Sequence, residues 1–280
     1  MTNRIQRFIA FLLVLCIPIF AIAGCTNNDV ANAANQVTTN ANGTYSIDTK
    51  TTTPEGKLDV YMLDIGQGDA ILLKVGDEYS MIDTGDIEHR ENIVAQLKTM
   101  GVTKLKNIII THPHADHMGG FYAIAKAMPI EHVYDDGIAV DNNMYKTYEK
   151  WIEKNKIQRT TLRSGDVVDF GHGAVFVVYA PWVEPLTDKK GETDLNNNSI
   201  VGILIFGKFS MLFTGDAEWQ EEKKLIKEQN SRLFARILKV GHHGSRTSSS
   251  EDFLKSIKPE SALISNGMYN KYGHPHDVTL

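Results

Sequence analysis

Hydrophobic and polar residues alternate along several short segments in the first half of the chain. Residues 57–64 (KLDVYMLD), 70–75 (AILLKV) and 79–82 (YSMI) are separated by glycine-containing turns, a pattern typical of a β-meander. Residues 91–100 (ENIVAQLKTM) carry apolar side chains at helical spacing and end before a glycine. The apolar run 105–110 (LKNIII) follows and predicts a buried strand.

The second half of the chain repeats this alternation. The pattern predicts strands at residues 174–179, 200–206, 210–213, 235–240 and 261–264, and helices at residues 119–127, 144–155, 218–229 and 249–257. The polar, glycine-containing segment 188–198 predicts a loop. Two strand-rich halves, each flanked by helices, indicate an α/β fold in which two sheets pack face to face with helices outside.

Residues 1–24 have the composition of an export signal. They contain Arg4, Arg7 and no acidic residue, and the apolar run 8–23 is too short to favour a spanning helix. Small residues directly before Cys25 resemble the lipobox of bacterial lipoproteins. We therefore expect Cys25 to be lipid-modified and to hold the protein on the extracellular face of the cytoplasmic membrane, through the lipid alone. The alternative is an ordinary signal peptide with an incidental cysteine.

Composition divides the remaining chain into a spacer and one domain. Residues 25–56 are rich in Asn, Thr and Ala and predict a flexible polar linker, whereas residues 57–280 are long enough for one large core. The formal net charge of −5 becomes −7 when the two arginines of residues 1–24 are removed. No basic stripe is visible, so we expect phosphate to be bound locally, at metals, rather than by surface charge.

Four potential metal ligands lie within six residues after the predicted strand 105–110. They are His112, His114, Asp116 and His117 in the segment THPHADHMGG. In an extended segment the first two histidines project to one side, and a helix that begins near Asp116 turns the other two ligands in a second direction. One loop can therefore serve two adjacent metal ions.

This segment resembles the HxHxDH signature of the metallo-β-lactamase superfamily. The resemblance implies a four-layered αββα sandwich with two divalent ions at the edge of the two sheets. It also implies that His112 and His114 bind one ion, at site one, and that Asp116 and His117 bind the other, at site two.

Three further motifs follow in the order that this resemblance implies. Asp83 in the segment IDTG corresponds to an early aspartate that supports the metal ligands from behind. Asp216 in the segment FTGD corresponds to an aspartate that bridges both ions. The segment VGHHGS supplies one ligand of site two, which is His243 or His242. We favour His243 as the ligand, with His242 contacting substrate or forming a hydrogen bond nearby.

The chain departs from the family pattern at one ligand of site one. Many members carry a histidine between the signature and the bridging aspartate, but here the only histidines are His132 and His172, which we interpret as structural or surface residues. The expected position holds the segment DLNNNS, which includes Asn198 and Ser199. Amide and hydroxyl groups are weaker ligands than imidazole, so the affinity of site one for zinc is expected to be lower. The expected ions are Zn²⁺, with Mn²⁺ as the alternative.

Two more segments narrow the resemblance to one subgroup. Residues 63–70 (LDIGQGDA) and 272–275 (YGHP), together with the missing histidine, are similar to the hydrolase domain of the competence protein ComEC and its free-standing relatives. The resemblance covers residues 57–280. Relatives continue through a further helix and strand beyond position 280, so we expect a truncated C-terminus with an unpaired sheet edge.

These resemblances favour a phosphodiesterase or nuclease that acts outside the cytoplasmic membrane. Two ions can hold a bridging hydroxide and neutralise the charge that develops on phosphorus. We expect Asp116 to serve in catalysis, and His274 or His242 to stabilise or protonate the leaving oxygen. The expected substrate is DNA or a cell-wall polymer, and no protein partner is predicted.

Three alternatives and two minor features remain open at this stage. The alternatives are a phosphorylcholine-esterase-like wall enzyme, a β-lactam hydrolase and a noncatalytic binding lipoprotein. Gln67 and Asp69 either line the site or form a tight turn. Tyr179 and Trp182 either stack on substrate or pack locally, and local packing is the commoner role for aromatic residues beside a loop.

Overall fold

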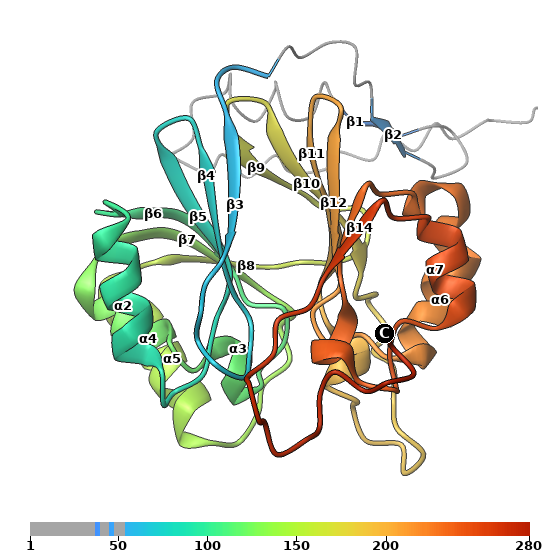
Figure 1. The fold of residues 1–280 in the computed structure, drawn as a ribbon. Coiled ribbons are helices and arrows are strands. Elements are labelled where there is room, and N and C mark those ends of the chain that lie inside the picture. Colours follow the sequence, from blue (N-terminus) through green and yellow to red (C-terminus); the bar gives the residue numbers. More distant parts are fainter. Residues whose placement is uncertain (1–36, 40–44, 48–53) are drawn as a thin grey trace, which may run out of the picture.

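Two six-stranded β-sheets form the middle of the molecule in the computed structural model, which describes residues 37–39, 45–47 and 54–280 (Figure 1). The predictions for the export signal and for Cys25 lie outside these residues. Within the expected spacer 25–56, the structure describes residues 54–56 and a short antiparallel pair, β1 (Val37–Thr39) and β2 (Tyr45–Ile47).

The first sheet is built from the first half of the domain. Its strands lie in the order β3 (Leu58–Met62), β4 (Ala70–Val75), β5 (Glu78–Thr84), β6 (Leu105–Ile109), β7 (Ile130–Asp135) and β8 (Gln158–Thr161). The pairs β3·β4 and β4·β5 are antiparallel, whereas the strands from β5 to β8 run parallel. Parallel pairing brings the carboxyl ends of β5, β6 and β7 to the same edge of the sheet.

The second sheet is built from the second half. Its strands lie in the order β14 (Ser261–Leu263), β13 (Ile237–Lys239), β12 (Phe209–Phe213), β11 (Val201–Phe206), β10 (Ala174–Ala180) and β9 (Val167–Gly171). The strands from β9 to β12 pair antiparallel, and β12, β13 and β14 run parallel. The carboxyl ends of β12 and β13 therefore lie together.

Helices cover the outer face of each sheet. Figure 1 shows α2 (Arg90–Thr99), α4 (Phe121–Ala127) and α5 (Asn143–Asn155) against the first sheet, and α6 (Trp219–Gln229) and α7 (Glu251–Ile257) against the second. The layer order is helix, sheet, sheet, helix, so the predicted αββα fold is confirmed. None of the helices among the described residues is long and apolar enough to cross a membrane.

Strand β10 shows how the sequence specifies these layers. All seven of its residues are buried. Phe176 and Val178 pack into the cluster between the two sheets, whereas Val177 and Tyr179 pack into the cluster beneath the second layer of helices. Because successive side chains of a strand point to opposite faces, a continuous apolar run fits only a strand that is covered on both faces.

Three strands were missing from the sequence prediction or only partly present in it. β8 has the sequence QRTT and its side chains lie mostly at the surface, so it carries no apolar alternation that would reveal it. β9 is short, although Val168 and Phe170 pack between the sheets. β7 was expected only as a short β-like segment around His132. The remaining predicted strands and helices are present, with ends shifted by a few residues.

Candidate metal centre

The HxHxDH segment lies in the loop after β6 and in the short helix α3 (Ala115–Met118). The strand is buried and delivers His112 and His117 to the interior, where neither residue is exposed to solvent. The helix begins at Ala115, close to the start expected from the sequence. A Cβ added at Gly120 would lie 2.0 Å from the carbonyl oxygen of Thr84, so glycine is required for the helix to approach the end of β5.

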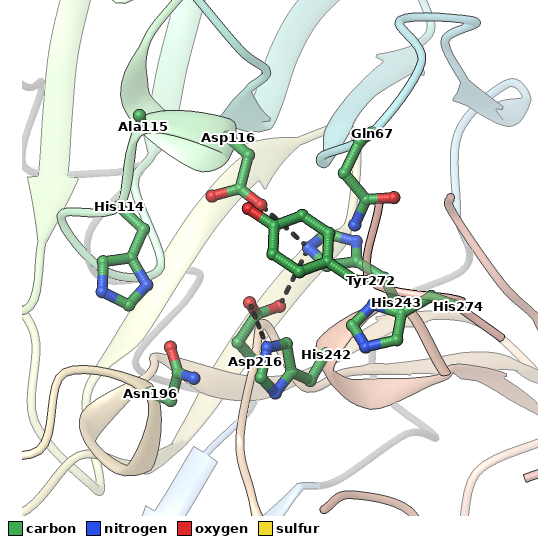
Figure 2. A pocket seen from close by; sticks show the side chains of 10 residues that line it. All are labelled: Gln67, His114, Ala115, Asp116, Asn196, Asp216, His242, His243, Tyr272 and His274. Carbon is green, nitrogen blue, oxygen red and sulfur yellow. Dashed lines mark ion pairs between the residues drawn. The ribbon is translucent and has the colours of Figure 1, made fainter. Parts of the chain in front are cut away.

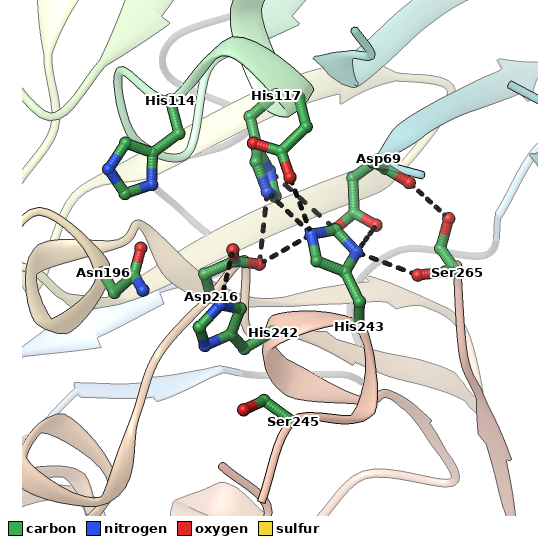
Figure 3. Close-up of polar contacts among 12 residues, drawn as sticks. Asp69, His114, His117, Asn196, Asp216, His242, His243, Ser245 and Ser265 are labelled. Carbon is green, nitrogen blue, oxygen red and sulfur yellow. Dashed lines mark hydrogen bonds and ion pairs between the residues drawn. The ribbon is translucent and has the colours of Figure 1, made fainter. Parts of the chain in front are cut away.

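Four donor atoms converge beside α3, where site two is expected. Each of four residues offers one ligand atom, and these atoms lie within 4.8 Å of one another: Asp116, His117, Asp216 and His243 (Figures 2 and 3). His243 Nε2 lies 3.3 Å from His117 Nε2 and 3.3 Å from Asp116 Oδ2. It lies 3.5 Å from Asp216 Oδ1. The structure therefore places His243 in this group, the residue favoured as ligand from the sequence.

A second group of donors lies on the other side of Asp216, where site one is expected. His112, His114 and Asp216 offer atoms within 4.8 Å of one another. His112 Nε2 lies 3.0 Å from His114 Nδ1 and 3.8 Å from Asp216 Oδ2. Asp216 thus presents Oδ1 to site two and Oδ2 to site one. This is the placement expected of a carboxylate that bridges two ions.

Contacts on the far side of two rings leave the converging nitrogens available to an ion. His117 Nδ1 lies 2.8 Å from Asp83 Oδ2, and His243 Nδ1 lies 2.9 Å from the carbonyl oxygen of Ser265. These acceptors favour a proton on Nδ1, so that Nε2 presents its lone pair to the site. Asp216 Oδ1 is buried and has no hydrogen-bond partner. The donor set therefore fits divalent metal ions.

Asp83 lies behind His117, as the sequence motif predicts. Its Oδ1 accepts a hydrogen bond from the Thr111 backbone N–H at 2.7 Å, and its Oδ2 accepts one from Thr111 Oγ1 at 2.8 Å. The residue is fully buried and has a φ of 58°, a left-handed conformation that is uncommon for a non-glycine residue. Asp83 thereby ties the end of β5 to the loop that carries the ligands.

A buried ion pair beneath site two was not predicted from the sequence. Lys239, at the end of β13, is 1% exposed and its Nζ pairs with Asp69 Oδ2. The same Nζ donates to the carbonyl oxygen of Gly215 at 3.3 Å. Asp69 Oδ1 lies 3.6 Å from His243 Nδ1, so Asp69 supports the site from behind and does not line the pocket. The only sign of this ion pair in the sequence is that Lys239 lies inside an apolar strand.

The site is strongly charged, and its histidines and carboxylates compensate one another. Burial alone would lower the pKa of His117 and of His243, but nearby carboxylates, above all Asp216, raise the pKa of His117 well above its usual value and that of His243 to about 10. These rings in turn hold the pKa of Asp216 well below its usual range despite burial. Without a metal ion, protons on these rings therefore balance the carboxylate charge that a metal ion would otherwise neutralise.

The segment that stands in place of the missing histidine forms η1 (Asn196–Asn198). Asn198 uses its amide within the loop, because Nδ2 donates to the carbonyl oxygens of Leu186 and Asp194 and Oδ1 accepts from the Leu186 N–H. Ser199 Oγ accepts from the Asp216 N–H at 3.1 Å and so helps to position the residue that the two donor groups share. Asn196, which the sequence prediction did not single out, lines the pocket instead of Asn198.

A pocket of about 350 Å³ opens over the two donor groups. Its wall includes His114, Asp116, Asp216, His242, His243 and, from the C-terminal segment, Tyr272 and His274 (Figure 2). Gln67 also lines the pocket, and its Oε1 accepts from the Gly267 N–H at 3.1 Å. Burial, reinforced by neighbouring histidines, lowers the pKa of His274 to about 4. The His274 ring is therefore neutral at pH 7.

Four other residues considered from the sequence lie outside this pocket. His132 stacks on Tyr134 within β7, and His172 occupies the turn between β9 and β10 beside Asp77. Tyr179 donates its hydroxyl to the carbonyl oxygen of Arg232. Trp182 packs under the ammonium of a lysine on α6, with the Nζ atom 4.0 Å from the ring centre. Local packing accounts for both aromatic residues.

Curated proteins similar to this chain include two competence proteins. "Competence protein ComA" of Neisseria gonorrhoeae is 30% identical over 226 residues, which make up 80% of this chain and 29% of the relative. "ComE operon protein 3" of Bacillus subtilis is 29% identical over 245 residues, which make up 81% of this chain and 30% of the relative. The chain thus spans less than a third of the length of these relatives. The resemblance to ComEC-type proteins expected from the sequence is confirmed.

Comparison with solved structures and family models identifies the fold and the family. The metallo-beta-lactamase fold protein YhfI from Bacillus subtilis superposes with a TM-score of 0.52 at 12% identity, covering 79% of this chain and 90% of that protein. A family model described as the metallo-beta-lactamase superfamily matches residues 63–267. With that match over most of its length, and with the αββα layers and the HxHxDH donors described, the chain belongs to the metallo-β-lactamase superfamily.

Proposed function

We propose that this protein is a two-metal hydrolase that cleaves phosphodiesters. The observation that carries the proposal is the arrangement of two donor groups that share Asp216 beneath one open pocket. Two divalent ions bound there, Zn²⁺ first and Mn²⁺ second, would supply a strong nucleophile from water at neutral pH and would neutralise charge on a phosphoryl group. DNA is one candidate substrate, which the resemblance to the ComEC hydrolase domain implies, and a cell-wall phosphodiester is the other.

The pocket walls suggest how the chain's own residues would act. Asp116 and Asp216 bring carboxylates to the pocket, which is also lined by His242, His274 and Gln67. With two divalent ions held by these carboxylates, the pocket would attract the anionic phosphodiester, and the other lining residues would lie beside its leaving group. Because the His274 ring is neutral at pH 7, we assign it to hydrogen bonding with the leaving oxygen rather than to donating a proton from an imidazolium.

Hydrolysis of bis(p-nitrophenyl) phosphate tests the proposal. Purified protein would be assayed with Zn²⁺ and with Mn²⁺, beside an Asp116→Ala variant that removes one carboxylate of site two. An Asp77→Ala variant is the matched control, because Asp77 is a highly exposed aspartate beside a histidine, in the turn between β4 and β5 and far along the strands from the donors. We expect metal-dependent turnover that the control retains and that Asp116→Ala lowers by at least about 100-fold.

Other results would select among the alternatives. Rapid turnover of nitrocefin with no phosphodiesterase activity would identify a β-lactam hydrolase and overturn the proposal. Fewer than one bound ion per chain, with both metals offered, would point to a noncatalytic binding protein. If the phosphodiesterase activity is present, single-stranded DNA and choline-decorated teichoic acid, supplied as separate substrates, distinguish a nuclease from a wall enzyme.

We further propose that the enzyme acts outside the cytoplasmic membrane, held by a lipid on Cys25. The support is the apolar run and the small residues that precede this cysteine. A Cys25→Ser variant, expressed in a bacterium that processes lipoproteins, should lose incorporation of labelled palmitate. Equal labelling of the variant and the wild type would refute the anchor.

A further inference from the structure

Site one is short of ligands by comparison with site two. Among the described residues, its tight donor group contains only His112, His114 and Asp216, whereas site two gathers four residues. Zinc in proteins is almost always held by three or four protein ligands, and imidazole nitrogen is preferred over neutral oxygen. The side of site one that faces the pocket is therefore where a further donor would be expected.

Two consecutive histidines at the end of β13 turn toward the same bridging carboxylate. His242 and His243 lie in η3 (Gly241–Gly244) with φ values of 46° and 54°. Both are left-handed conformations that cost energy for a non-glycine residue and are concentrated at functional sites. His243 Nε2 lies 3.5 Å from Asp216 Oδ1, and His242 Nε2 lies 3.8 Å from Asp216 Oδ2.

Each oxygen of Asp216 is thus approached by one histidine of this pair and by one histidine of the HxHxDH segment. Oδ1 has His243 at 3.5 Å and His117 at 3.2 Å. Oδ2 has His242 and His112, both at 3.8 Å. Two ligands on one tetrahedral zinc ion with bonds of about 2.1 Å lie roughly 3.4 Å apart, so both pairs have a spacing close to that of ligands on a common ion.

Glu218 contacts the His242 ring in the same way that acceptors contact the rings of His117 and His243. His242 Nδ1 lies 3.0 Å from Glu218 Oε1, and that oxygen also accepts from Thr247 Oγ1 at 2.8 Å. A carboxylate bonded to one ring nitrogen favours the proton there and leaves the other nitrogen free to bind an ion. Asp83 contacts Nδ1 of His117 in this way, and the carbonyl oxygen of Ser265 contacts Nδ1 of His243.

We propose that His242 is the third imidazole ligand of site one, in place of the histidine that the sequence lacks, and that Glu218 is its positioning residue. This inference rests on the proposed two-metal centre. Site one then has three imidazoles and one carboxylate, a donor set that suits zinc. The ring approaches from the pocket side, where 23% of the His242 side chain is exposed, so it has room to move toward the ion.

Asn196 is the competing donor for the same position. Its Oδ1 is buried without a hydrogen-bond partner, and its Nδ2 lies 3.5 Å from Glu218 Oε1. In Figure 2 the amide lies on the same side of the pocket as His114. The observations favour His242, because imidazole is the better zinc ligand and because its contact with Glu218 is shorter by 0.5 Å, at 3.0 Å against 3.5 Å.

Metal binding to four variants tests the inference without relying on activity. His242→Asn removes the ring nitrogen, and asparagine tolerates the left-handed backbone at this position. Glu218→Gln removes the orienting carboxylate, Asn196→Ala removes the competing amide, and His132→Ala is the control for loss of a histidine outside the pocket. Each protein is dialysed against buffered Zn²⁺ alone and its bound metal is measured by mass spectrometry.

The expected result separates the two sites. Wild type, Asn196→Ala and His132→Ala should hold two ions, whereas His242→Asn should hold one at the zinc level that just saturates wild type. Glu218→Gln should weaken the same site by about 10- to 100-fold. With Co²⁺ bound, His242→Asn should absorb less visible light than wild type. A cooperative thermal melt, together with the ion retained at site two, shows that the variant is folded.

Two results would overturn the inference. If His242→Asn retains both ions with wild-type affinity, His242 is not a ligand. If Asn196→Ala loses the ion that His242→Asn retains, the amide completes site one. A wild-type protein that binds less than one ion would refute the two-metal centre itself. That failure would appear in wild type and in the His132→Ala control, whereas a loss confined to His242→Asn concerns site one alone.

Discussion

Replacing Asp83 with Asn tests whether the centre depends on residues that never touch the ions. The carboxylate accepts three hydrogen bonds, from the Thr111 N–H, the Thr111 hydroxyl and His117 Nδ1. An amide has one acceptor oxygen, so its NH₂ group must face at least one of these donors. The His117 ring then keeps its proton on Nδ1 less firmly, and the tautomer with Nε2 protonated cannot bind metal.

The expected loss of metal affinity at site two is about 10- to 100-fold, the usual cost of removing the acceptor behind a metal-binding histidine. That range corresponds to about 1.4 to 2.8 kcal/mol. Because Asp83 is fully buried, the donor left without an acceptor should also lower the free energy of unfolding by roughly 1 to 3 kcal/mol. Zinc affinity would be measured by competition with a chromophoric chelator, and stability by urea unfolding.

The matched control is Asp77→Asn, the same chemical change at an aspartate that also faces a histidine. Asp77 Oδ1 lies 3.1 Å from His172 Nε2, but the Asp77 side chain is 93% exposed. We expect wild-type zinc affinity for this variant. Unchanged zinc affinity in Asp83→Asn, with the loss of stability present, would refute the role of Asp83 in setting the His117 tautomer.

Further predictions concern the buried charges and the ions. Lys239→Met leaves Asp69 buried without its cation and should cost about 3 to 5 kcal/mol in urea unfolding, whereas Lys104→Met, which breaks an exposed pair, should cost less than about 1 kcal/mol. Equal effects would contradict this reasoning. In metal-free protein the raised pKa of His243 contributes stability that is complete below about pH 6.5 and is lost as the pH rises through about 10. Unfolding free energies measured from pH 6 to pH 10 should therefore fall for metal-free protein and change less for the zinc form. Removal of metal with EDTA should lower the melting temperature, and re-addition of Zn²⁺ should restore it, because ions that bind only the folded state stabilise it.

The sequence was sufficient for the layers of the fold because the apolar pattern of individual strands reflects how they are covered. The run that forms β10 is apolar at every position, and its short length and its valines favour a strand with both faces buried. β8 gave no such signal, since its position depends on backbone pairing with β7 and its side chains contribute little to the core. A strand without a buried face has no hydrophobic period to detect.

The ligands were easier to predict than the residues that hold them. His112 and His117 share one short segment, and their density alone indicates metal chemistry. Glu218 instead resembled an ordinary residue at the start of a helix, and its contact with His242 depends on a turn that brings β13 beside α6. Sequence spacing contains no information about such contacts between distant segments. Lys239 was different, because a lysine within a buried strand already implies a buried partner.

The metal centre joins the two halves of the fold at the edge where their strand ends meet. His117 follows β6 of the first sheet, whereas His243 follows β13 of the second, and the two ring nitrogens lie 3.3 Å apart although 126 positions separate the residues. Asp216, at the end of β12, faces donors from both halves. Any opening that separates the sheets at this edge therefore separates the ligands. Ions that need ligands from both halves would bind only when the ligands are together, so they should make the two halves unfold together rather than one after the other.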